Sequence, residues 1–115
     1  MKRIFISGSY SADNVMDILR NIRDGIMIST EVLRLGYSPF CPWLDYHFVL
    51  MDFEDKLKLE DFYRYSIDWL EVSDGLLLIG DWQKSKGSVK EWTFAKKNNI
   101  PVFYGLNELK TIKHN

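Results

Sequence analysis

The most constraining feature of this sequence is an apolar run without alternation, Gly75 to Ile79, which reads GLLLI. A half-buried strand alternates apolar and polar side chains, so an unbroken run is typical of a central strand covered on both faces. Such strands belong to parallel sheets, because crossover connections place helices on both sides. The run therefore predicts an α/β protein with a parallel sheet.

The rest of the chain alternates between strand and helix patterns. Further strands are expected at residues 3–7, 37–40 and 101–104, and helices at 13–36, 59–72, 88–98 and from about 107. The aromatic segment at 41–48 has no regular period, and we expect a loop that leads into a short helix. The order predicts a single domain over residues 1–115 with a flavodoxin-like or Rossmann-like three-layer fold and four to five parallel strands.

Composition narrows the classes of partner. The chain has 115 residues, 46% of them hydrophobic, and its 15 Lys and Arg nearly balance its 16 Asp and Glu. Without a strong charge bias, we expect no binding to duplex nucleic acid or to an anionic membrane surface. Any phosphate that the chain binds must therefore be held locally.

Cysteine and leader signals point to the cytoplasm. The single cysteine, Cys41, has no partner for an internal disulfide, and with two scattered histidines it does not form a zinc motif. The N-terminal apolar stretch is far shorter than a signal-peptide core, and no run has the ~20 apolar residues of a membrane span. We expect a cytoplasmic protein without a metal.

The expected sheet directs attention to two loops. In open parallel sheets, ligands bind at the carboxyl ends of the strands where the strand order reverses. The loops at residues 8–14 and 80–91 follow the first strand and the apolar strand. In the first loop, Gly8 and Ser9 precede a helix N-terminus, where free N–H groups favour an anion. The alternative is that these small residues only turn the chain.

The second loop carries a carboxylate. Ser85 and Gly87 precede the expected helix, and Glu91 follows about one turn into it. The positive end of the helix dipole favours the ionised form of Glu91, which a carboxylate nucleophile at a sugar carbon requires. The alternative is that Glu91 only complements the dipole or caps the first turn.

Several short motifs together suggest a family. They are Ile4-Phe5-Ile6-Ser7-Gly8, Trp69-Leu70 followed by Ser73-Asp74, Ser85-x-Gly87-x-x-x-Glu91, Ala95, and Ile100-Pro101-Val102. In this combination the chain resembles the nucleoside 2-deoxyribosyltransferase superfamily. It is most similar to the small phage and bacterial members of unassigned function, and more distantly to the deoxynucleoside 5′-monophosphate N-glycosidases.

The resemblance implies a chemistry and a set of roles. Glu91 would attack the anomeric carbon of a deoxyribosyl group and expel the base, and water or a second base would then take the glycosyl group. In the monophosphate-specific branch, Ser9, Ser85 and Gly87 would hold the 5′-phosphate together with Gly8. No metal or cofactor is needed. Homologous proteins form dimers or larger oligomers, so a homo-oligomer is expected.

One position departs from the family pattern. Active members carry an aspartate three residues before the position of Trp69, and here that residue is Ser66. Asp68 is nearby, but two residues turn a helical side chain by about 200°. Asp68 is therefore the candidate acid only if the helix is rotated or irregular, and the alternative is a surface charge.

Aromatic residues are the remaining candidates for ligand contact. Tyr10 occupies a position where the family usually has an aromatic residue near the ligand, and its alternative is a rim residue over the first helix. Four aromatic residues could stack on a base: Trp43, Tyr46, Phe48 and Trp82. Trp82 is the best candidate of the four, because it lies on the loop that follows the central strand. More often such residues belong to a core or a subunit interface.

Three functions are compatible with these patterns. The first is an enzyme that cleaves or transfers the glycosyl group of a nucleoside or nucleoside 5′-monophosphate through Glu91. The alternative is a nucleotide-binding protein without turnover, which Ser66 in place of the aspartate favours. A third possibility is an interaction protein that keeps only the fold.

Overall fold

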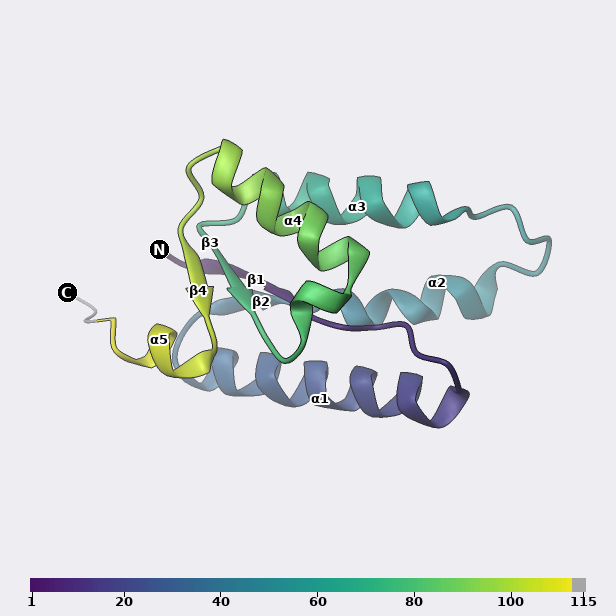
Figure 1. Cartoon of the computed structure of the whole chain (residues 1–115), viewed down its shortest axis with the longest axis horizontal. Helices are drawn as coiled ribbons and strands as arrows, with labels where there is room; N and C mark the ends of the chain where they lie inside the picture. Colours follow the sequence, from purple (N-terminus) through teal and green to yellow (C-terminus); the bar gives the residue numbers. More distant parts are fainter. Residues whose placement is uncertain (113–115) are drawn as a thin grey trace.

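A computed structural model describes residues 1–112 of the chain. Its elements are β1 (Arg3–Ser7), α1 (Val15–Arg34), β2 (Ser38–Phe40), the 3-10 segment η1 (Pro42–Asp45), α2 (Tyr46–Met51), α3 (Leu59–Glu71), β3 (Gly75–Leu78), the 3-10 segment η2 (Trp82–Lys84), α4 (Lys86–Lys97), β4 (Val102–Tyr104) and α5 (Leu106–Lys110). The strands form one parallel sheet in the order β2-β1-β3-β4 (Figure 1). This mixed α/β architecture confirms the predicted fold class.

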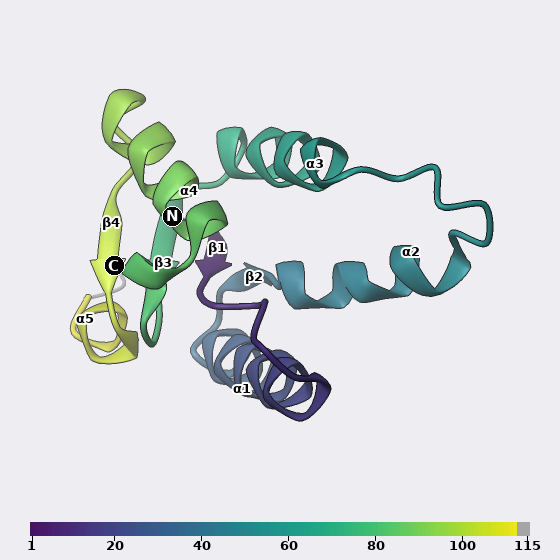
Figure 2. The same cartoon turned by 45° about the vertical axis from the view of Figure 1, so that its right-hand side comes forward.

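Helices cover the sheet on both faces. Figure 2 shows α1 on one side and α3 with α4 on the other. Ile4, Ile6 and Leu77 pack in the core below α1 and α5, whereas Phe5 and Leu76 pack in the core below α3 and α4. Adjacent residues of β1 and β3 therefore point into different cores, and all of β3 is buried. This explains why GLLLI shows no alternation.

The strand order creates a switch point between β1 and β3. Ile4 lies opposite Gly75 and Ser7 lies opposite Leu78, so the two strands end side by side. From β1 the chain crosses to β2 at one edge, and from β3 it crosses to β4 at the other. The loops that leave β1 and β3 diverge at this point, which opens a space at the carboxyl edge of the sheet.

Helix α1 packs closely on η1. Asn14, not Asp13, is the N-cap, and its side chain accepts a hydrogen bond from the amide of Asp17. A Cβ atom on Gly25, in the middle of α1, would overlap the ring of Trp43. The missing side chain lets Trp43 pack in the core, and the Trp43 indole N–H donates to the carbonyl of Ser9 across 3.0 Å. This contact connects α1, η1 and the loop after β1.

Helices α2 and α3 extend beyond the edge of the sheet and are joined by residues 52–58 (Figure 2). Aromatic contacts join α3 to its neighbours: Trp69 stacks on Phe40 of β2 at 5.5 Å, and Tyr65 meets Phe48 of α2 edge-on at 5.6 Å. Within residues 1–112, no helix is both long enough and apolar enough to cross a membrane.

Candidate functional site

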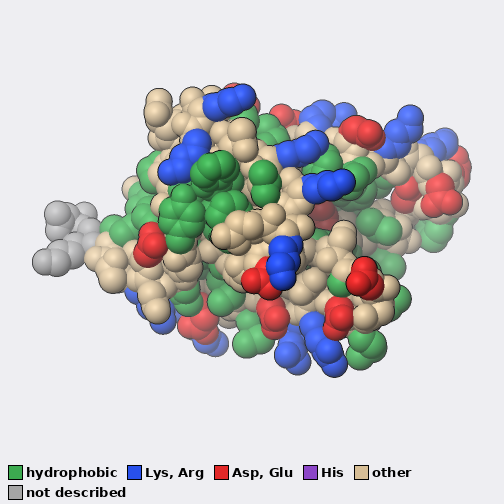
Figure 3. All heavy atoms as spheres, viewed as in Figure 1, with side chains coloured by type: hydrophobic (Ala, Val, Ile, Leu, Met, Phe, Trp, Pro, Cys, Tyr) green, Lys and Arg blue, Asp and Glu red, His purple; other side chains and the backbone are tan. Residues whose placement is uncertain are grey.

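A cleft of about 1130 Å³ opens at the carboxyl ends of β1 and β3. Its walls come from residues 8–12 after β1, the first half of α1, η1, Val49 of α2, the first part of α3, Asp81, residues 84–88, and Glu91. In the space-filling view, the molecule is hollowed between the lobe of α3 and α4 and the lobe of α1 (Figure 3). The cleft lies at the switch point of the sheet, where doubly wound folds bind their ligands.

Glu91 lies at the base of this cleft. Its side chain is on α4 and only 8% exposed. Oε1 of Glu91 accepts a hydrogen bond from the hydroxyl of Ser7 at 2.6 Å, and the hydroxyls of Ser7 and Ser88 are hydrogen-bonded at 2.9 Å. Because a carboxylate only accepts, the single Ser7 proton points to Glu91 and the Ser88 hydroxyl donates to Ser7 when Glu91 is ionised.

Burial dominates the electrostatics of Glu91. Burial is the main reason that the pKa of Glu91 is raised to about 7. The hydrogen bond from Ser7 lowers this pKa, and the negative charge of Asp45 raises it. Helix α4 begins at Lys86, two residues before the predicted start, so Glu91 is its sixth residue. The expectation that the helix dipole would keep Glu91 ionised is wrong, because the dipole acts mainly within the first turn and burial outweighs it.

The cleft brings together the loop residues that the sequence singled out. Gly8, Ser9 and Tyr10 line it from the end of β1, and Ser85 and Gly87 line it from the start of α4.

Two of these residues leave little room for change. A Cβ on Gly8 would lie 2.8 Å from a carbon of the Ile79 side chain, and one on Gly87 would lie 3.3 Å from the ring of Tyr63. The Oγ of Ser85 caps α4 by accepting from the amide of Ser88. The capping role that we considered for Glu91 thus belongs to Ser85.

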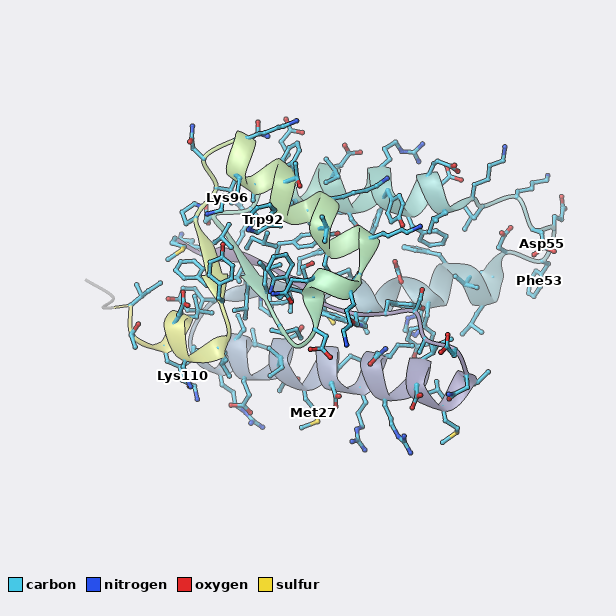
Figure 4. The ribbon with its side chains drawn as sticks, in the orientation of Figure 1. Met27, Phe53, Asp55, Trp92, Lys96 and Lys110 are labelled. Atoms are coloured by element: carbon cyan, nitrogen blue, oxygen red, sulfur yellow. The ribbon has the colours of Figure 1, made fainter. Side chains whose placement is uncertain are left out.

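Two predicted residues lie outside the described walls of the cleft. Asp68 is exposed on α3, on the far side from Ser66, which is buried and lines the cleft. Trp82 packs on Trp92 at 5.9 Å and on Tyr104 at 6.2 Å, over β4 and away from Glu91. Figure 4 labels Trp92, which directly follows Glu91 on α4. The regular helix makes Asp68 a surface charge, and ring packing directs Trp82 into an aromatic cluster.

The structure adds Asp45, which the sequence patterns did not single out. Asp45 is the last residue of η1, is half-buried, and lines the cleft with Glu91. Burial raises the pKa of Asp45 to about 6. The signal in the sequence is a single carboxylate between Leu44 and Tyr46 in an otherwise apolar and aromatic stretch.

Charged side chains of both signs stand at the rim (Figure 3). Arg20 pairs with Asp17 at 3.1 Å, and Lys84 lies 3.9 Å from Asp81. Lys86 also lines the cleft and is exposed. No group of three His, Cys, Asp or Glu side chains within residues 1–112 is arranged to hold a metal ion.

The sheet and its cleft define a doubly wound α/β protein with a polar opening at the switch point. Residues 2–105 match the model of a family described as a domain of unknown function (DUF7768), and the chain belongs to that family. No curated protein matches the sequence.

Proposed function

We propose that this protein cleaves the N-glycosidic bond of a nucleoside or nucleoside 5′-monophosphate through a covalent glycosyl intermediate on Glu91. The observation that supports this most directly is a buried carboxylate at the base of a large polar cleft, oriented by a serine from the neighbouring strand. The resemblance to the deoxyribosyltransferase superfamily supplies the reaction type.

The first step needs one free oxygen on Glu91. Ser7 occupies Oε1, so Oε2 is the atom for attack on C1′ of the sugar. As the C1′–O bond forms, the C1′–N bond breaks and its electron pair leaves with the base, which takes up a proton. With a pKa of about 7, Glu91 is about half ionised at neutral pH, and its ionised, nucleophilic fraction grows as the pH rises.

The loops at the cleft offer partners for the rest of the substrate. Ser9, Ser85 and Gly87 are assigned to the 5′-phosphate, with Lys84 and Lys86 near them to balance its charge. Tyr10 is assigned to the sugar or base, which its place in the cleft wall supports.

A second candidate function is nucleotide binding without turnover. Ser66 lines the cleft at the position where active members of the resembling superfamily have an aspartate, and a hydroxyl does not donate a proton at neutral pH as a carboxylic acid does. In this alternative the same loops hold the nucleotide, and Glu91 only contributes to binding.

The deciding experiment measures free base. Purified wild type, Glu91→Gln and Glu71→Gln are incubated with ribonucleosides, deoxyribonucleosides and their 5′-monophosphates, and released base is separated by liquid chromatography. Glu71 is exposed at the end of α3 and serves as the matched control. We expect release by wild type and by Glu71→Gln, and a loss of more than about 10³-fold in Glu91→Gln.

Other outcomes of this experiment distinguish the nucleotide-binding protein from a protein with neither candidate function. Thermal stabilisation by one compound without release of base supports the binding protein, because a ligand of the native state stabilises it by RT ln(1 + [L]/Kd). Neither release nor stabilisation contradicts both candidate functions.

We also propose that the chain forms a homodimer or a larger homo-oligomer. Helix α2 presents several exposed apolar side chains, and Phe53 beyond it is 83% exposed. Phe53 follows α2 in the segment that joins α2 and α3, and it lies at the outer extremity of the molecule (Figure 4). An apolar surface of this kind is typical of a subunit contact.

A further inference from the structure

Asp45 and Glu91 differ from the other acidic residues of the cleft. Asp17, Asp24 and Asp81 each lie within 4 Å of a basic side chain, at distances of 3.1, 3.9 and 3.9 Å. The carboxylate of Asp45 forms no hydrogen bond or ion pair with the described residues, although it is half-buried. Since a buried carboxyl group without a partner is costly, Asp45 has no evident role in holding the fold together.

The surroundings of Asp45 locate it inside the cleft. Burial raises the pKa of Tyr10, Tyr65 and Glu91, and the negative charge of Asp45 raises each of them further. Tyr10 lines the cleft from the loop after β1, Glu91 lines it from α4, and Asp45 lines it from η1. The side chains of Asp45 and Glu91 therefore border the same cleft. The cations that line this cleft, Arg20, Lys84 and Lys86, are exposed at its rim.

The proposed reaction leaves one role without a residue. A purine or pyrimidine anion is a poor leaving group, so cleavage needs an acid that protonates the base as the C1′–N bond breaks. Ser66 has no acidic proton to give at neutral pH, and Asp68 is exposed outside the cleft.

We propose that Asp45 is the catalytic residue that donates this proton, from η1 rather than from α3. The inference rests on the proposed function of Glu91. In the first step the Asp45 proton goes to a ring nitrogen of the base while Glu91 binds C1′. In the second step water attacks C1′, the bond to Glu91 breaks, and the proton of water returns to Asp45.

The two carboxyl groups share one proton in the active form. Each negative charge opposes ionisation of the other, so the pair titrates as a unit and the rate should pass through a maximum. With pKa values of about 6 and about 7, this maximum is expected near pH 6 to 7. Because Asp45 has the lower pKa of the two, the form with the proton on Asp45 is the minor one of the two singly protonated forms.

The test compares two leaving groups. Wild type, Asp45→Asn and Asp68→Asn are assayed on 2′-deoxyguanosine, or its 5′-monophosphate, and on the N7-methylated counterpart, whose base leaves without taking up a proton. If only pyrimidine nucleosides are cleaved, 4-nitrophenyl 2-deoxyriboside is the activated substrate. We expect Asp45→Asn to lose about 10²- to 10⁴-fold on the natural substrate and less than about 10-fold on the activated one.

The control and a second variant make the result unambiguous. Asp68→Asn should keep both rates within about twofold, because Asp68 is exposed and outside the cleft. Asp45→Glu retains a carboxyl group. It should be slower than wild type but keep the wild-type ratio of the rates on the natural and the activated substrate. The fall in rate above the pH maximum should disappear in Asp45→Asn, because no acid remains to lose its proton.

Two results would overturn the proposal. Wild-type rates in Asp45→Asn, or an equal loss on both substrates in both Asp45 variants, would show that Asp45 donates no proton. If wild type releases base and Glu91→Gln does not, such a result removes only the role of Asp45. If wild type cleaves neither substrate, the proposed function of Glu91 fails first.

Discussion

The hydroxyl of Ser7, the last residue of β1, donates a hydrogen bond to the buried carboxylate of Glu91 on α4 across 2.6 Å. The two residues are 84 positions apart in the chain. Their contact depends on the parallel register that brings the ends of β1 and β3 together and on the loop that returns α4 over them. We therefore propose that Ser7 orients the carboxylate of Glu91 and favours its ionised form against the effect of burial.

Replacing Ser7 by alanine should raise the pKa of Glu91. The hydrogen bond from Ser7 favours the ionised form, so its loss leaves more Glu91 protonated at neutral pH. We expect Ser7→Ala to lower base release about 10- to 100-fold at pH 7, the range for a hydrogen bond to a charged group. The difference in rate between Ser7→Ala and wild type should shrink at higher pH, where Glu91 is ionised in both proteins, and a pH–rate profile measures this change.

Ser29→Ala is the matched control for that profile. Ser29 is also buried, but its hydroxyl donates to the carbonyl of Gly25 within α1. Its removal should leave the pH profile unchanged. An equal loss of activity in Ser7→Ala at every pH would contradict the electrostatic role of Ser7.

Glu91 should make the protein less stable as the pH rises. Its pKa is about 7 in the folded chain and 4.5 ordinarily, so between these values the folded state binds more protons than the unfolded state. The stability from this group is complete below about pH 4.5 and is lost as the pH rises through 7. The loss amounts to about 3 kcal/mol, at 1.36 kcal/mol per pKa unit.

Thermal melts of wild type and Glu91→Gln measure this effect. We expect similar melting temperatures at pH 5 and a higher one for Glu91→Gln at pH 8, because glutamine does not ionise. Asp68→Asn, which changes an exposed carboxylate, should differ from wild type by a constant amount. A constant difference for Glu91→Gln as well would mean that burial does not shift its pKa.

Gly25→Ala should destabilise the fold, although alanine usually stabilises a helix relative to glycine by about 0.5–1 kcal/mol. The new methyl group would overlap the ring of Trp43 and force η1 away from α1. Overpacking of this kind costs about 1–3 kcal/mol, and chemical denaturation measures it. Met27→Ala, on the outward side of α1 (Figure 4), is the control and should change stability little. A stabilised Gly25→Ala protein would disprove the close packing.

The apolar surface of α2 should control the oligomeric state. Met51 is 68% exposed at the end of α2, and an aspartate there would place a charge in the proposed contact between subunits. Light scattering after gel filtration should give a dimer or larger for wild type and a monomer for Met51→Asp. Met27→Asp changes an equally apolar exposed site on α1 and should keep the wild-type state. A monomeric wild type at micromolar concentration would contradict the proposal.

Helix α4 illustrates how far a periodicity argument reaches. The apolar pattern predicts Val89, Trp92, Thr93 and Ala95 as its inner positions. Ala95 is buried, but the other buried residues of the helix are Ser88 and Glu91. The polar face turns inward because it lines the cleft, and burial of Glu91 is stabilised by Ser7 from another element. A hydrophobic pattern detects faces that pack against other apolar side chains, and it misses a helix face that lines a cleft with polar side chains.

The order of strands and helices, the parallel sheet and the two loops at its switch point were all determined by the sequence alone. Local composition carries these features, since strand and helix periods, glycines and helix ends depend on near neighbours. The pairing of Ser7 with Glu91, the placement of Asp45 in the cleft and the removal of Trp82 from it were decided only by the tertiary structure. Each depends on which distant side chains meet and how much water they lose, and no local pattern records either quantity.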